Sequence, residues 1–146
     1  MQIVTSSFFT NLPNHVAPIS IARWAPKSAR TIPTLRALCP GRWFRSATTE
    51  EYRERYLRQL DLLDPVTVVQ EIEALSAGRT AALLCWERPH DGCFCHRGYV
   101  SVWFSETLGL VVPEFGREND GTGWSHPKLP ARYLRTPETT TSDRSS

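Results

Sequence analysis

The chain has 146 residues and a formal net charge of +2, with 40% hydrophobic and 22% charged residues. This length and composition suit one globular domain with a core of its own, and no apolar run approaches the roughly 20 residues that span a bilayer. The N-terminus lacks the basic region and long apolar segment of a signal peptide. We therefore expect a cytoplasmic protein, without a membrane partner, whose four cysteines are thiols in a reducing compartment.

The charge is unevenly distributed along the chain. Residues 1–49 contain six basic and no acidic residues, whereas the remainder contains 11 basic and 15 acidic residues. Aromatic side chains (Trp24, Trp43 and Phe44) interleave with the basic ones. This mixture is typical of surfaces that bind phosphates and stack bases. The alternative is that the aromatics fill the core and the arginines form a solvated surface.

Two short strands are expected near the N-terminus. Residues 2–5 form the first, and the small polar Ser6 follows at the turn. Residues 16–22 form the second, with Pro18 marking its start or an edge position. Arg23 then emerges from the end of the second strand. Residues 24–46 contain three prolines and no clean periodicity, which predicts a long loop with a short strand or turn near residues 34–38.

The clearest helix is predicted over residues 48–63. Thr48 and Glu51 have the spacing of a capping box, and the apolar residues after them recur at helical intervals. A second helix begins at Asp64-Pro65, with Asp64 as N-cap, and ends at Gly78.

A buried strand is predicted over residues 80–86, followed by a turn and a third, amphipathic helix. That helix begins near Cys95 and ends at Gly109. Residues 110–113 predict one more short strand, with Glu114 at its end. The alternation of strands and helices predicts an α/β domain with a mostly parallel, three-layer sheet.

The turn after the central strand concentrates the reactive groups. In an open α/β sheet, ligands bind at the carboxyl ends of the strands, in such turns. We therefore expect six side chains to converge on one cleft: Ser6, Arg23, Glu87, Cys95, His96 and Arg97.

Two roles are assigned to these six residues. Cys95 lies at a helix N-terminus, where the dipole favours a thiolate nucleophile, and Glu87 and His96 are candidates for proton transfer. Ser6, Arg23 and Arg97 are the candidates for binding phosphate. The alternatives remain open: Cys95 as a small core residue, and Glu87 in a structural salt bridge with Arg97 or Arg23.

A zinc site is the other chemistry that closely spaced cysteines suggest. Structural zinc usually takes ligand pairs separated by two to four residues. Cys93 and Cys95 are closer than that, His96 is adjacent to Cys95, and Cys85 would have to turn out of the strand interior. The spacing therefore predicts no metal, and we expect no cofactor.

The central motif resembles a known family. Leu84-Cys85-x-Glu87, followed by Cys95-His96-Arg97 at the start of a helix, is similar to the domain-of-unknown-function 488 (DUF 488) family. Further pieces fit in order over residues 2–115, and these are Thr5-Ser6, Ser20-Ile21-Ala22-Arg23, Tyr52/Tyr56 and Leu63-Asp64-Pro65. The resemblance implies a compact Rossmann-like α/β domain, and the activity of the family is unassigned. Cys93 and the C-terminal tail lie outside the pattern.

Composition divides the chain into three parts. Residues 1–115 form the DUF 488-like domain, residues 116–136 an irregular arm, and residues 137–146 a tail expected to be disordered. The apolar residues of the arm predict packing on its own domain, with another subunit as the alternative. For function we expect a small enzyme acting on a phosphate-bearing ligand, a nucleotide or nucleic acid. The alternative is a non-catalytic binding module that uses the same pocket.

Overall fold

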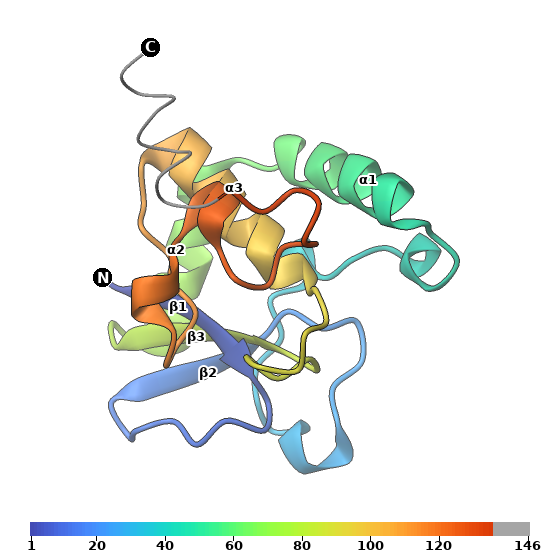
Figure 1. Ribbon diagram of the computed structural model, residues 1–146. Coiled ribbons are helices and arrows are strands. Elements are labelled where there is room, and N and C mark those ends of the chain that lie inside the picture. The colour runs from blue at the N-terminus through green and yellow to red at the C-terminus, as the bar shows by residue number, and fades with distance from the viewer. Residues whose placement is uncertain (136–146) are drawn as a thin grey trace.

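The computed structural model describes residues 1–135, so the tail predicted to be disordered at 137–146 lies outside the described residues. Its centre is a sheet of three parallel strands in the order β1-β3-β2 (Figure 1). The strands are β1 (Ile3–Ser7), β2 (Val16–Ser20) and β3 (Thr80–Cys85). This confirms the α/β class and the parallel sheet. The apolar run of β3 occupies the central position, which is buried on both faces.

Single parallel bridges extend the sheet at both edges. Thr34 bridges to Ser20 of β2, where a short strand or turn was expected. On the other edge, Glu114 bridges to Thr5 of β1. The strand predicted at residues 110–113 is wrong, because none of these residues lies in a strand and only the next residue, Glu114, forms a bridge to the sheet.

The first helix, α1 (Thr49–Asp61), begins where the sequence predicted it. The Glu51 backbone N–H donates to Thr48 Oγ1, and the Thr48 N–H donates back to Glu51 Oε1, both at 3.1 Å. This reciprocal capping box supplies partners for two amides at the helix N-terminus. The helix turns Tyr52, Tyr56 and Leu60 inward.

The other two helices are α2 (Pro65–Ser76) and α3 (His96–Leu108), and Gly109 closes α3 in the left-handed conformation with φ 65°. The prediction that α3 is amphipathic is wrong, because every residue of α3 from His96 to Phe104 is buried. The arm after residue 115 covers the side that would otherwise face solvent. A Cβ added to Gly98 would lie 2.9 Å from the backbone nitrogen of Leu129, so glycine permits this close approach.

Five short 3-10 turns complete the described secondary structure. Three precede α1 (Lys27–Ala29, Arg36–Leu38 and Arg42–Arg45), and two lie in the arm (Glu118–Asp120 and Gly123–Ser125). No helix in the described part of the chain is both long and apolar enough to cross a membrane.

All three helices lie on the same side of the sheet and share one hydrophobic core with it (Figure 1). The opposite face is covered by side chains of loops and not by a helix, and these are Phe8, Leu12, Ile32 and Phe115. Within residues 1–135, helices therefore cover only one face of the sheet, whereas the sequence predicted a layer on each face of the sheet. The long proline-containing loop after β2 supplies part of the second cover, where a helix would stand in a doubly wound fold.

Candidate functional site

A pocket of about 400 Å³ lies at the carboxyl ends of β2 and β3. Five aromatic residues contribute to its wall, together with two arginines, one carboxylate and the start of α3. The aromatic residues are Trp24, Phe44, Tyr52, Trp86 and Phe94, and the charged residues are Arg23, Arg45 and Glu87. Cys85, at the end of β3, and Cys95 and His96, at the start of α3, also line the pocket. The pocket therefore forms where the sequence placed it, at the sheet edge on which parallel strands end.

Two tryptophans and two arginines meet at one side of the pocket. The indole Nε1 of Trp86 donates to the backbone oxygen of Trp24 at 2.7 Å, which ties the two loops together. The guanidinium carbons of Arg45 and Arg23 lie 4.4 and 5.3 Å from the centre of the Trp24 ring. Cation–π contacts of this kind hold both positive charges beside the pocket. Two of the six basic residues of the N-terminal third therefore meet aromatic residues of the same third here.

Glu87 is half-buried in the pocket wall and makes no ion pair or hydrogen bond within residues 1–135. The structure does not pair it with Arg97, which was one of the partners considered. Burial raises the pKa of the nearby Tyr52 hydroxyl well above its usual range, and the Glu87 charge raises it further. The pocket therefore holds an unpaired carboxylate beside a hydroxyl that stays protonated.

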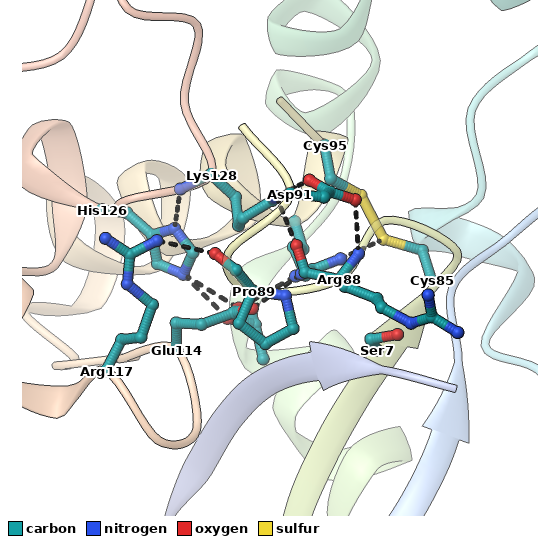
Figure 2. A network of polar contacts seen from close by, with 12 residues as sticks. Ser7, Cys85, Arg88, Pro89, Asp91, Cys95, Glu114, Arg117, His126 and Lys128 are labelled. Atoms are coloured by element: carbon teal, nitrogen blue, oxygen red, sulfur yellow. Dashed lines mark hydrogen bonds and ion pairs between the residues drawn. A yellow bond between two sulfur atoms is a disulfide. The ribbon is translucent and has the colours of Figure 1, made fainter. Parts of the chain in front are cut away.

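The cysteine prediction is wrong for one pair. Cys85, at the end of β3, and Cys95, just before α3, form a disulfide at the base of the pocket (Figure 2). The two residues are ten positions apart, and the loop between them returns the chain to the end of the strand it has left. In this state Cys95 has no thiolate and is not a nucleophile.

The other two cysteines, Cys39 and Cys93, are free. Cys93 is exposed and does not line the pocket. Burial raises the pKa of Cys39 to about 11, against the opposing effect of Arg36, so this thiol is inert near neutral pH.

His96 is buried at the first position of α3, only 6% exposed. Its Nε2 lies 2.7 Å from the Ile21 backbone oxygen, an acceptor, so Nε2 carries the proton and donates it. Nδ1 is then a free lone pair, 3.6 Å from the sulfur of Cys95. Burial lowers the pKa of His96 to about 4, and the charge of Arg97 lowers it further, so the ring is neutral at pH 7.

Arg97 does not reach the pocket. Its side chain is fully buried, and its Nε and Nη2 donate to the two oxygens of Glu114 at 2.9 and 2.6 Å. Its Nη1 lies 3.1 Å from the sulfur of Cys85. The prediction that Arg97 binds phosphate is therefore wrong, since its donors are committed to groups of the protein itself.

Ser6 also lies away from the pocket. It is buried in β1 and, because side chains alternate along a strand, it shares the sheet face of Val4 and not that of Thr5. Its hydroxyl has no partner in the described chain. Of the six predicted site residues, the structure thus brings four together, Arg23, Glu87, Cys95 and His96, and separates two.

Behind the pocket lies a buried polar network that the sequence did not indicate (Figure 2). Thr5 Oγ1 donates to Glu114 Oε1 at 2.7 Å and accepts from His126 Nε2, also at 2.7 Å. The backbone N–H of Lys128 donates to His126 Nδ1, which makes Nε2 the protonated nitrogen. The network joins the arm to the edge of the sheet. Its arm residues, His126 and Lys128, lie in a segment with no periodic pattern, so nothing in the sequence marks them as buried.

Lys128 holds the loop that carries Glu87. Its buried ammonium donates to the Arg88 backbone oxygen at 2.7 Å and to Asp91 Oδ1 at 2.8 Å. Burial alone would raise the pKa of Asp91, but the Lys128 ammonium and two backbone amides lower it to about 2. Asp91 is therefore charged at neutral pH, and the arm fixes the loop between Cys85 and Cys95.

No protein-family model, curated protein or solved structure matches the chain. The DUF 488 resemblance therefore stays a prediction.

Proposed function

We propose that the pocket binds a small phosphate-bearing ligand with a planar ring, and a nucleotide is the class that fits best. The observation that carries the proposal is the combination of two arginines with several aromatic rings around one space of about 400 Å³. That volume falls within the range of small-molecule sites. Aromatic rings stack with bases of any identity, and guanidinium groups bind phosphate oxygens.

Arg23 and Arg45 are the proposed phosphate ligands. Arg23 Nε is buried and has no hydrogen-bond partner in the described chain. A buried donor without a partner costs free energy, so a ligand oxygen that accepts from it binds favourably. Neither arginine forms an ion pair with an acidic residue among residues 1–135, whereas Arg97 is paired with Glu114. Their charge is therefore available to an anion.

If the site is catalytic, Glu87 is the proposed proton-transfer group. The disulfide occupies Cys95, and His96 has its proton on the nitrogen that is bonded to Ile21. Of the three predicted catalytic residues, Glu87 alone lines the pocket with no competing partner among residues 1–135. The second candidate, a non-catalytic binding module, uses the same arginines and aromatics and does not need the carboxylate.

The motif order also supports two finer proposals. We propose a relationship to the DUF 488 family because the motifs that carry the resemblance occur at strand ends and at the start of α3. A Rossmann-like relationship rests on the parallel sheet with its pocket at the carboxyl ends of the strands. A cytoplasmic location likewise stays a prediction.

The proposal is tested by titrating the protein with adenosine monophosphate. Binding is detected as quenching of the fluorescence of Trp24 and Trp86. Replacing Arg45 with Ala removes a charged ligand and should weaken binding about tenfold or more, the range for a hydrogen bond to a charged group. Arg42→Ala is the matched control, because Arg42 is exposed on the same 3-10 turn but does not line the pocket. Equal effects of the two variants, or no binding by the wild type, would contradict the proposal.

The same titration with a single-stranded oligonucleotide separates the two forms of the ligand. A free nucleotide engages the pocket alone, so its affinity depends weakly on salt. A strand that also contacts Arg42 and its basic neighbours would show a steep loss of affinity with salt, and Arg42→Ala would flatten it.

A further inference from the structure

We propose that, once the disulfide is reduced, Cys85, Cys95 and His96 bind one zinc ion at the base of the pocket. The ligand atoms of these three buried residues lie within 4.8 Å of one another. The sequence argued against zinc because Cys93 and Cys95 are too closely spaced, His96 is adjacent to Cys95, and Cys85 would have to turn out of the strand. In the folded chain Cys93 is not needed, because the loop from Trp86 to Phe94 brings Cys95 and His96 back beside Cys85 at the end of β3.

The geometry at His96 suits a metal ligand. Zinc bonds of about 2.3 Å to sulfur and about 2.0–2.1 Å to nitrogen, at a tetrahedral angle, separate the two ligand atoms by about 3.6 Å. The observed distance from Cys95 Sγ to His96 Nδ1 is 3.6 Å. The other ring nitrogen donates to the Ile21 carbonyl, which is the usual outer contact of a metal-binding histidine and leaves Nδ1 free.

The backbone around the two cysteines also leaves room for an ion. Their Cα atoms are 7.5 Å apart, more than the roughly 4.4–6.8 Å usual for a disulfide. Arg97 Nη1 points at the Cys85 sulfur from 3.1 Å, and a guanidinium hydrogen bond of this kind supports a thiolate ligand from outside the coordination shell. Two thiolates and one imidazole form a donor set that favours zinc over hard cations such as magnesium.

Reduction and metal binding are separate steps. Two molecules of a thiol reductant are oxidised to one disulfide, while Cys85 and Cys95 each gain one electron and one proton. Zn²⁺ then replaces the two thiol protons, which pass to the solvent. The oxidised chain has no thiolate to offer at this site, so the redox state of one bond decides whether the metal binds.

Three protein ligands leave a fourth position open, as in catalytic zinc sites. All three ligand residues line the same pocket as Glu87, so a water molecule or an oxygen of a bound ligand can take this position. The inference goes beyond the proposed nucleotide function and does not depend on it, since the ion alone is the probe.

The experiment measures metal uptake by the full chain. The protein is reduced with a phosphine, treated with a chelator, given excess Zn²⁺ without oxygen, desalted and analysed for zinc. The reduced wild type should retain about one zinc per chain, and the oxidised protein none. Cys85→Ser, Cys95→Ser and His96→Ala should each lose it. Cys39→Ser and Cys93→Ser are matched controls that remove the two other cysteines and should retain it.

A second measurement uses the wild type alone, in case the site variants do not fold. Bound zinc should protect Cys85 and Cys95 from alkylation, while Cys93 reacts at the same rate with and without metal, as mapped by peptide mass spectrometry. Replacing zinc with Co²⁺ should add the charge-transfer absorption of cobalt–thiolate bonds. Reduced protein that binds no zinc, or zinc that leaves Cys85 and Cys95 as reactive as before, would overturn the proposal. Neither result bears on nucleotide binding, which is measured without metal.

Discussion

Arg97 and Glu114 form a bidentate pair inside the protein, with neither side chain exposed to solvent. The pair joins the first turn of α3 to the edge of the sheet. A cation at this end of a helix is opposed by the dipole by roughly 0.3–1 kcal/mol. Glu114 provides the compensating negative charge, so Arg97 is explained by the fold and requires no external anion.

The first prediction concerns that pair. Arg97→Ala leaves a buried carboxylate without its partner and should lower the free energy of unfolding by about 3–5 kcal/mol. The double variant Arg97→Ala/Glu114→Gln should lose less, because the stranded charge is also removed. Urea denaturation at pH 7 measures both. Arg58→Ala, which breaks an exposed ion pair with Glu54, is the control and should cost no more than about 1 kcal/mol. A single variant as stable as this control would contradict the prediction.

The second prediction follows from His126. Burial lowers the pKa of its ring to about 3, and the charges of Arg97, Lys128 and Arg117 lower it further. An unfolded chain binds this proton near pH 6.5, so between these pH values the unfolded state holds a proton that the folded state lacks. The stability from a neutral His126 is complete above about pH 6.5 and is lost as the pH falls toward 3.

The measurement is the free energy of unfolding at intervals from pH 7.5 to 5. Each buried histidine of this kind adds a slope approaching about 1.4 kcal/mol per pH unit below pH 6.5. His126→Gln should reduce the slope, whereas His15→Gln, which changes an exposed ring, should leave it intact. Parallel pH profiles for wild type and His126→Gln would count against a neutral buried ring.

A third prediction compares two tyrosines buried in the same core. Tyr56 Oη donates to the Leu38 backbone oxygen at 2.5 Å, while Tyr99 Oη has no hydrogen-bond partner in the described chain. Tyr56→Phe leaves a buried carbonyl unsatisfied and should cost about 1–3 kcal/mol. Tyr99→Phe removes only an unpaired hydroxyl and should be neutral or stabilising. Thermal unfolding of the two variants ranks them, and a larger loss for Tyr99→Phe would refute the assignment.

The fourth prediction compares Glu87, in the pocket wall, with Glu114, in the buried network behind the pocket. Glu87 has no partner within residues 1–135, so Glu87→Gln should change the free energy of unfolding by no more than about 0.5 kcal/mol. Removing its negative charge should also tighten nucleotide binding, and should abolish any turnover in which it acts as a base. Glu114→Gln is the matched control and should be strongly destabilising. A large loss of stability in Glu87→Gln would mean that a structural partner exists.

Local signals predicted the elements of the fold well. The capping box at Thr48 and Glu51 and the glycine after α3 fix helix ends through contacts within one turn, so the sequence carries them directly. The apolar run of β3 likewise predicted a buried strand. Because the carboxyl ends of parallel strands share one sheet edge, the position of the pocket also followed.

The partners of the site residues could not be predicted in the same way. Arg97 pairs with a residue 17 positions away, and Cys85 with one ten positions away, across segments whose relative placement depends on the whole fold. The sequence offered Glu87 as a partner for Arg97, but Glu114 is the carboxylate that faces α3, and spacing does not encode that. The burial of α3 from His96 to Phe104 arises from the arm, whose composition resembles that of an exposed loop.

The Lys128 ammonium gives the arm a role in the pocket that its composition does not suggest. It holds the loop carrying Glu87 through Asp91 and the Arg88 carbonyl, while the backbone oxygen of Lys128 accepts from the Cys95 amide at 2.8 Å. One residue of the arm thus grips both the loop and the start of α3. We therefore expect detachment of the arm and opening of the pocket to occur as one cooperative event, so that amides at the two places share one free energy of opening in hydrogen exchange.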